Sequence, residues 1–175
     1  MTQQQTPSIK AIIGLGNPGR QYSRNRHNIG FRIVDALADK YGASWQTKDA
    51  MEYTTVTING QNIILIKPQT FMNSSGKVCP YLAKQGIKAE NIVVVHDELE
   101  LPFGHIKTKV GGSAKGHNGL KSIIAACGEL FNRLRFGIGR PEQRERVPDY
   151  VLENFSEDVE PYIEKAVSAI VQMLG

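Results

Sequence analysis

The chain has 175 residues, of which 41% are hydrophobic and 22% charged, with a net charge of +4. This length suits one domain, and the composition excludes collagen, a coiled coil and a disordered chain. The aliphatic runs Ile63–Ile66 and Ile92–Val95 are too short for the roughly 20 apolar residues of a membrane span, and residues 1–7 lack the apolar stretch of a signal peptide. Because Cys79 and Cys127 fit neither a disulfide framework nor a zinc spacing, we expect reduced thiols and a cytoplasmic protein.

The positive charge is concentrated in one part of the chain. Between Phe103 and Arg140 there are seven basic residues and one acid, Glu129, which gives this stretch a net charge of +6 and leaves −2 for the rest. A basic segment on a slightly acidic body favours a polyanionic partner such as nucleic acid. A solvated charged face is the plainer alternative.

Strands are predicted wherever short apolar or alternating runs end at turn residues. In chain order these are residues 8–14, 52–58, 62–67, 92–96, 105–110 and 133–139. Asn59-Gly60 separates the second and third runs and is a strong signal for a hairpin turn. The run at 92–96 is continuously apolar and β-branched before its histidine, as in a strand buried on both faces.

Helices are predicted where apolar residues recur at helical spacing. They cover residues 28–41, a segment after Asn73, a segment from Asn118 to Gly128, and a last segment capped by Ser156. We expect Ser74 or Ser75 to cap the second helix, and Pro80 to kink that helix or to mark its true start. The charged stretch 140–149 reads as a mobile surface loop.

The alternation of these elements predicts a single α/β domain over residues 8–175, after a loosely ordered tail at 1–7. Its sheet should be mixed, mostly parallel and twisted, with helices on both faces.

Gly14-Leu15-Gly16-Asn17-Pro18-Gly19 has the glycine spacing of a dinucleotide-binding loop. The polar, aperiodic segment after it is not the helix that should receive a pyrophosphate, and the acid expected about 20 residues further on is missing. A nucleotide-binding oxidoreductase is therefore a weak alternative, and the glycines are better read as a tight turn.

Side-chain amides stand at three predicted junctions between elements. Asn17 follows the first strand, Asn73 follows the hairpin and Asn118 precedes a helix. Loops of this kind converge beyond the carboxyl ends of strands in an open α/β sheet, where ligands bind. Each amide offers a donor and an acceptor that can read a substrate or hold a water, and its alternative role is a helix cap or a turn.

His27 and Asp97 are the candidate acid–base pair. His27 precedes a predicted helix and Asp97 ends the buried strand. A neutral histidine with one nitrogen on a carboxylate can take a proton from water with the other. No serine lies in a nucleophile elbow and neither cysteine has polar neighbours, so attack by water is favoured over a covalent intermediate.

A metal site is the competing interpretation of the histidines. His96, Asp97 and Glu98 are consecutive, with His105 and His117 further on. Neighbouring side chains on a strand point to opposite faces, and no paired-ligand spacing is present, so no metal and no cofactor are expected.

Taken together, these segments closely resemble the bacterial peptidyl-tRNA hydrolase family from Ile9 to about Phe155. The motifs that carry the resemblance are Gly14–Gly19 with Tyr22, Arg26–Gly30, Lys67–Gly76, His96–Gly104, Gly116–Lys121 and Arg133–Arg140. The resemblance implies a monomeric α/β protein that hydrolyses the ester between a peptide and the 3′ ribose of tRNA, without metal or cofactor.

The resemblance also implies roles for individual residues. His27 would be the general base and Asp97 would orient it. The remaining implied substrate contacts fall into three groups: the amides Asn17, Asn73 and Asn118, which hold substrate and water; Tyr22, Met72 and His117, which line the cleft; and Lys107, Lys109 and Arg135, which bind the tRNA acceptor arm. Chloroplast splicing factors resemble the same family, so a non-catalytic RNA-binding module is the main alternative.

Overall fold

The computed structural model describes residues 7–175 and contains one seven-stranded sheet with the order β2-β3-β4-β1-β5-β7-β6. The strands are β1 (Ala11–Gly14), β2 (Gln46–Lys48), β3 (Met51–Ile58), β4 (Gln61–Pro68), β5 (Ile92–Glu98), β6 (Ile106–Val110) and β7 (Asn132–Gly137). Neighbours among β4, β1, β5 and β7 pair in parallel, whereas β3 and β6 run antiparallel to the strands beside them. The predicted mixed, mostly parallel sheet is confirmed. The predicted tail lies outside the described residues except for Pro7.

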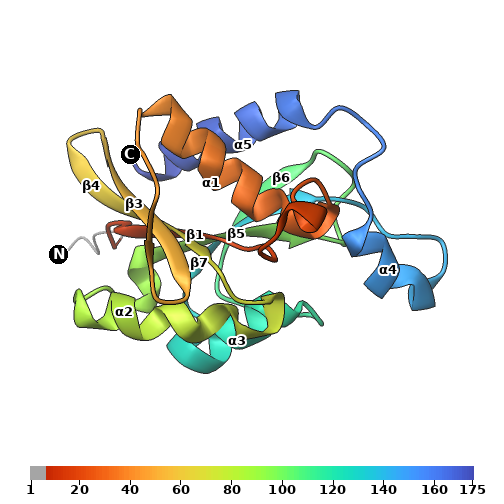
Figure 1. Ribbon diagram of the computed structural model, residues 1–175, viewed down its shortest axis with the longest axis horizontal. Helices are drawn as coiled ribbons and strands as arrows, with labels where there is room; N and C mark the ends of the chain where they lie inside the picture. Colours follow the sequence, from red (N-terminus) through yellow and green to blue (C-terminus); the bar gives the residue numbers. More distant parts are fainter. Residues whose placement is uncertain (1–6) are drawn as a thin grey trace, which may run out of the picture.

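Helices cover both faces of this sheet, as predicted (Figure 1). The α-helices are α1 (Ile29–Lys40), α2 (Cys79–Lys84), α3 (Asn118–Cys127), α4 (Val147–Leu152) and α5 (Glu160–Met173). Short 3₁₀ helices are η1 (Arg20–Tyr22), η2 (Arg26–Asn28), η3 (Met72–Val78), η4 (Ala89–Asn91) and η5 (Arg144–Arg146). Within residues 7–175, none of the helices has the length and apolar character needed to cross a membrane.

The two faces of the sheet bury separate apolar cores. Residues Val93 and Val95 of β5 point to the face covered by α1 and α5, and Val94 points to the face covered by η3, α2 and α3. This alternation follows from the two-residue period of a strand. It explains why the apolar run of β5 is continuous, since each of its sides meets a different layer of helices.

Several local predictions are confirmed by the structure. Asn59 and Gly60 both have positive φ, as a two-residue hairpin turn requires, and they join β3 to β4. Pro80 lies in the first turn of α2 and so marks the start of that helix. Gly128, with φ of 80°, ends α3.

Other local predictions are wrong. Ser156 does not cap the last helix: α5 begins at Glu160, its N-cap residue is Val159, and Pro161 lies in its first turn. The segment at 140–149 is not an irregular loop, because it contains η5 and the start of α4. Neither Ser74 nor Ser75 is a cap, since both lie inside η3.

The prediction of reduced thiols is also wrong. Cys79, at the start of α2, and Cys127, at the end of α3, are joined by a disulfide. Each cysteine has apolar neighbours, which is what the sequence indicated, but the folded chain brings these two helix ends together.

Candidate active site

His27, Asp97 and His117 meet at the carboxyl end of β5. His27 lies in η2 just before α1, Asp97 is the sixth residue of β5, and His117 is the N-cap residue of α3. Because α1 and α3 cover opposite faces of the sheet, Asp97 stands between residues from both helical layers. The carboxylate is nearly inaccessible to solvent, with 2% of its side chain exposed, against 12% for His27.

Hydrogen bonds define the protonation of this cluster. His27 Nδ1 lies 2.8 Å from Asp97 Oδ2, and His117 Nε2 lies 2.7 Å from Asp97 Oδ1. The backbone N–H groups of Gly119 and Leu120 donate to His117 Nδ1, so the hydrogen of neutral His117 is on Nε2 and is donated to Asp97. His27 likewise donates from Nδ1 to the carboxylate. Its Nε2 is therefore the unprotonated nitrogen when the ring is neutral.

The electrostatics of the pair follow from burial and proximity. Burial alone would lower the pKa of His27, but the adjacent Asp97 carboxylate outweighs this effect and the net pKa is raised. Burial opposes ionisation of Asp97, yet His27 and His117 hold the pKa of its carboxyl well below its usual range. Asp97 is thus a fixed negative charge that favours the imidazolium form of His27.

His96 precedes Asp97 on β5 and, unlike His27, has a lowered pKa. Its Nδ1 donates to the backbone oxygen of Asp97 at 2.8 Å, and its ring lies 5.4 Å from that of His117. Burial is the main cause that lowers the pKa of His96 to about 4. His96 Nε2 is buried without a hydrogen-bond partner among the described residues, so this imidazole stays neutral.

The segment that carries His27 is held by α4, a contact that the sequence did not reveal. The Arg26 guanidinium stacks 3.9 Å over the Tyr150 ring and donates to the Tyr150 backbone oxygen at 3.0 Å. The Arg26 backbone N–H donates to the oxygen of Glu153, and the Asn25 side chain caps η2 by accepting from the Asn28 N–H. The position of His27 therefore depends on residues more than 120 positions further along the chain.

Asn17 connects the segment that carries His27 to the start of η3. Its Oδ1 accepts from the Met72 backbone N–H at 2.7 Å, and its own backbone pairs reciprocally with the Asn28 side chain. Asn17 is 8% exposed. It therefore has a structural role, which was the alternative to substrate binding. Its Nδ2 has no hydrogen-bond partner within residues 7–175 and remains a donor for a ligand or water.

The other predicted substrate residues surround these loops. Asn73 and Asn118 are exposed at the starts of η3 and α3. Tyr22 packs edge-on against Phe71 with 6.5 Å between ring centroids, and Phe71, which sequence reasoning did not single out, is 61% exposed. Met72 is buried, and its sulfur packs against Gly119 at the start of α3.

The predicted cationic residues share one face of the sheet. Lys107 pairs with Arg135, and Lys109 with Arg133, across β6 and β7. Alternation then places all four on the face that α3 covers. Lys107 and Lys109 are exposed, whereas Arg135 is partly buried and its Nε donates to a Glu98 oxygen at 2.9 Å.

Arg133 has a structural task that the sequence did not indicate. It is 3% exposed, and its guanidinium donates to the backbone oxygens of Gly112 and Ser113. Its charge therefore holds the loop between β6 and α3 in place beside the cationic face.

A groove of about 380 Å³ joins the histidine cluster to the cationic face. It is lined by His27, Asp97, His117 and Asn118, by Lys109 and Arg135, and by residues of η5 and α4. The structure thus brings most predicted site residues to one groove. Lys107, Asn17, Tyr22, Met72 and Asn73 are not among the residues that line it.

The part of the chain that the structure describes contains one cluster of side chains of the types that bind metal ions. Ligand atoms of His27, Asp97 and His117 lie within 4.8 Å of one another. The metal ligands that the sequence suggests include Asp97 and His117, which belong to this set, and also His96, Glu98 and His105, which do not. The nitrogens that face Asp97 already donate hydrogen bonds to it, so a bound cation would have to replace both bonds.

A buried carboxylate orients an imidazole with a free nitrogen, and a cationic groove begins beside this pair. These features are typical of a hydrolase that activates water and binds an anionic substrate. Comparison with known proteins gives the family. The family model described as Peptidyl-tRNA hydrolase matches residues 11–175. The chain belongs to the peptidyl-tRNA hydrolase family, as the sequence motifs indicated.

Individual relatives agree over nearly their full lengths. The peptidyl-tRNA hydrolase of Bartonella henselae is 45% identical over 166 residues, which cover 94% of this chain and 86% of the relative. That of Rickettsia prowazekii is 45% identical over 167 residues, covering 94% and 90%. The crystal structure of peptidyl-tRNA hydrolase from Acinetobacter baumannii superposes with a TM-score of 0.89 at 37% identity, covering 98% of this chain and 89% of that one. The assignment of this chain as an enzyme of that family rests on these matches.

Proposed function

We propose that this enzyme cleaves the ester between a peptide and the 3′ ribose of tRNA by attack of a water that His27 activates. The observation that carries the mechanism is the 2.8 Å contact between His27 Nδ1 and Asp97 Oδ2. It leaves His27 Nε2 unprotonated and fixes the direction in which it points. A water within hydrogen-bond reach of Nε2 loses its proton to the ring as it attacks the ester carbonyl.

The proton then returns to the leaving group. Asp97 stabilises the imidazolium formed during attack, because its charge is permanent at neutral pH. The imidazolium of His27 can protonate the departing ribose oxygen, which restores the neutral base. No protein nucleophile is needed, in keeping with water attack without a covalent intermediate. The role that we assign to Asn17, whose Oδ1 is engaged by Met72, is to hold the water or the carbonyl oxygen through Nδ2.

The cationic face supplies the affinity for the tRNA. Lys107 and Lys109 are exposed side by side on β6, and Arg135 lies on β7 at the groove. Phosphate contacts of this kind are independent of sequence and sensitive to salt, which suits a substrate class with many tRNAs. We assign the acceptor arm to this face and the 3′ end to the groove.

The peptide is recognised through groups that all peptides share. Asn73 and Asn118 offer exposed amides at the starts of η3 and α3, where they can pair with the peptide main chain. A substrate with a free α-amine lacks the first peptide bond and leaves these polar groups unpaired, which disfavours aminoacyl-tRNA. We further propose that the protein acts as a monomer in the cytoplasm, where its substrate arises during translation.

The test is hydrolysis of two matched substrates. Purified protein is incubated with N-acetyl-aminoacyl-tRNA and with unblocked aminoacyl-tRNA, and the release of each acyl group is followed. We expect cleavage of the first and little cleavage of the second. Tight binding of both with cleavage of neither would instead favour the RNA-binding alternative.

A further inference from the structure

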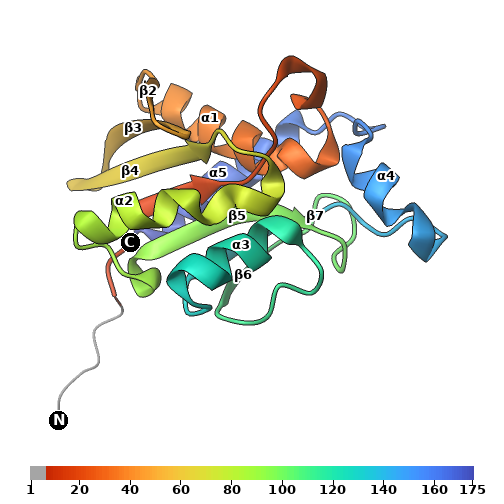
Figure 2. The same ribbon diagram turned by 60° about the horizontal axis from the view of Figure 1, so that its bottom comes forward.

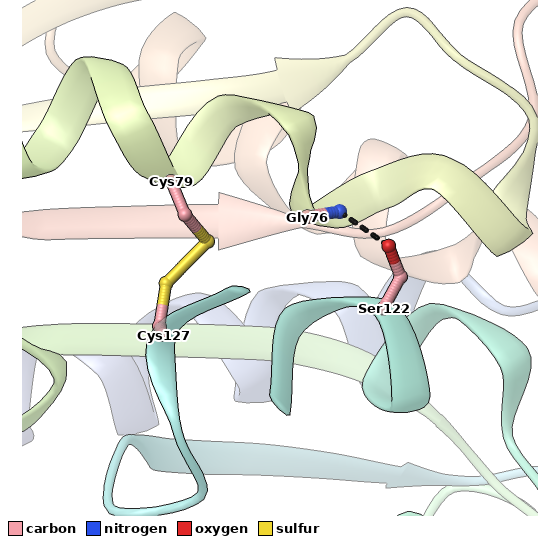
Figure 3. Close-up of a disulfide and its surroundings, with 4 residues drawn as sticks. All are labelled: Gly76, Cys79, Ser122 and Cys127. Atoms are coloured by element: carbon pink, nitrogen blue, oxygen red, sulfur yellow. Dashed lines mark hydrogen bonds between the residues drawn. A yellow bond between two sulfur atoms is a disulfide. The ribbon is translucent and has the colours of Figure 1, made fainter. Parts of the chain in front are cut away.

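The disulfide between Cys79 and Cys127 joins the two segments that present the proposed peptide-binding amides (Figure 3). One segment begins with Met72 and Asn73 in η3 and continues into α2, and the other is α3, which begins with Asn118. The second segment starts at the groove that His27 lines, the first starts where Met72 packs on Gly119, and the disulfide ties the two segments at the opposite end. The two Cα atoms lie 6.2 Å apart, within the range that a disulfide spans.

Three contacts hold these segments side by side, as Figure 2 shows for α2 and α3. Nearest the active site, Gly119 packs so closely on Met72 that a Cβ there would lie 2.5 Å from the sulfur. In the middle, the Gly76 N–H donates to Ser122 Oγ at 2.8 Å, and a Cβ on Gly76 would overlap the Ser122 backbone. The disulfide is the third contact and the only covalent one within residues 7–175.

The disulfide is within reach of a small thiol. A surface groove of about 840 Å³ is lined by both cysteines, between the ends of α2 and α3. Cys79 is 4% exposed, and Cys127 is partly exposed at the end of its helix. An incoming thiolate can therefore reach a sulfur without unfolding the protein, which is the access that exchange requires.

We propose that the Cys79–Cys127 disulfide is a redox-sensitive clamp that controls how η3 and α3 present Asn73 and Asn118 to the substrate. A thiolate attacks one sulfur and forms a mixed disulfide, and a second thiol releases it, so that two external thiols become one external disulfide and the protein gains two thiols. A small-molecule disulfide reverses the reaction. The effect on the substrate rests on the proposed function, because it assumes that the two amides bind the peptide.

The reduced protein keeps the Gly76–Ser122 contact and the apolar packing, so it stays folded but holds the two segments less tightly. Since small displacements of positioning groups cost up to about 10²-fold, we expect KM to rise by about 3- to 10-fold on reduction, with a smaller change in kcat. In cytoplasmic proteins a disulfide is usually transient or redox-sensing, which suits such a clamp better than a permanent staple.

The experiment compares oxidised and reduced protein in buffers of reduced and oxidised glutathione. Thiols are trapped with iodoacetamide and counted by mass, KM is measured with N-acetyl-aminoacyl-tRNA, and hydrogen exchange is followed at residues 72–78 and 118–127. We expect a reversible change of two thiols, faster exchange in both segments on reduction, and the rise in KM. The variant that carries both Cys79→Ser and Cys127→Ser is the matched control, because it has no thiol left to exchange and should resemble the reduced protein in every buffer.

The possible results separate the clamp from the proposed function. Two free thiols in every glutathione buffer, or equal exchange rates in the oxidised and reduced protein, would overturn the clamp. Altered exchange with an unchanged KM would support the clamp and overturn the assignment of Asn73 and Asn118 to substrate binding. A redox response that persists in the double variant would also overturn the proposal, since this chain has only these two cysteines.

Discussion

His117 Nε2 lies 2.7 Å from Asp97 Oδ1, whereas His27 Nδ1 contacts the other carboxylate oxygen, Oδ2. The same ring accepts two backbone N–H groups of α3 through Nδ1. One side chain therefore caps α3 and holds the Asp97 carboxylate that we propose orients His27. We infer that His117 is a positioning residue in addition to lining the cleft.

The first prediction concerns this positioning role. His117→Ala removes a donor from Asp97, which leaves the carboxylate interacting more strongly with protonated His27. We expect kcat/KM at pH 7 to fall about 10-fold, and the acidic limb of the pH profile to move to higher pH. His117→Asn keeps a capping group for α3 and serves as the control for stability. An unchanged pH profile in His117→Ala would limit His117 to the helix cap.

The second prediction concerns the base itself. Because Asp97 raises the pKa of His27 above 6.5, activity should fall as pH drops through a midpoint above that value. His27→Ala should lose about 10²- to 10⁴-fold in rate while tRNA binding changes little. Initial rates from pH 5.5 to 9 and a filter-binding assay give both quantities.

Asp97→Asn separates orientation from charge. The neutral amide removes the main cause that raises the pKa of His27 and leaves the burial that lowers it, so the acidic limb should shift to lower pH. We expect a smaller loss in rate than in His27→Ala, since the base is still present.

Full activity of His27→Ala at neutral pH would refute the mechanism.

How much of this site was predictable depended on the distance between partners in sequence. His27 and Asp97 could be found because each stands at the end of an element whose pattern is local: a helix start and a buried strand. The His117–Asp97 bond joins a helix cap to a strand 20 residues away, and no local pattern reports it. The contacts of Arg26 with Tyr150 span 124 residues, so no local pattern reports that α4 holds the segment of His27.

The fold shows the same limit. Alternation and helical spacing predicted the sheet, the hairpin at Asn59-Gly60 and both helical layers, because these patterns repeat within each element. The Cys79–Cys127 disulfide could not be predicted, since its formation depends on how two helix ends meet in space across 48 residues. Ser156 is not the cap of α5, because the helix begins later, at Glu160. Pro161 then lies in the first turn, where proline is favourable.

The third prediction tests the cationic face. Changing Lys107, Lys109 and Arg135 together to Ala should raise KM for full-length tRNA and flatten its salt dependence, because up to three phosphate contacts are lost. Cleavage of a minimal substrate with only the 3′ terminal nucleotides should change little. KM values at three salt concentrations test this expectation.

Two controls sharpen that test. Lys10, Lys40 and Lys165 are exposed elsewhere, and their joint change to Ala removes the same charge without touching this face. Glu98→Gln frees Arg135 from the ion pair at 2.9 Å and should strengthen tRNA binding. If the minimal substrate suffers as much as full-length tRNA, the face does not bind the tRNA body.

The fourth prediction distinguishes recognition from structure at Asn73. Its side chain is exposed at the start of η3, so replacement should leave stability nearly unchanged. Asn73→Ala should lower kcat/KM chiefly through KM, and Asn73→Asp should be worse because a carboxylate cannot donate a hydrogen bond. Kinetics and melting temperatures of both variants decide the matter. Unchanged kinetics in both would remove Asn73 from the site.

The last prediction concerns the buried imidazole of His96. Its pKa is lowered from 6.5 to about 4, mainly by burial, whereas in the unfolded chain it titrates near 6.5. Between these values the unfolded chain binds the extra proton, so His96 contributes stability above pH 6.5 that is lost as pH falls towards 4. At about 1.36 kcal/mol per pKa unit, the loss approaches ~3 kcal/mol. His27 acts with the opposite sign, because its raised pKa favours the folded state at low pH.

His96→Leu isolates this contribution. Leucine fills the buried space but loses the hydrogen bond from Nδ1 to the Asp97 backbone oxygen, so the variant should be less stable at pH 7. The wild-type protein should lose more stability than the variant between pH 6.5 and 4, and the two urea unfolding curves should approach each other as pH falls. His105→Leu, at an exposed position, is the matched control and should keep the wild-type pH dependence. Parallel pH dependences for wild type and His96→Leu would mean that His96 takes up a proton in the folded state as readily as in the unfolded chain.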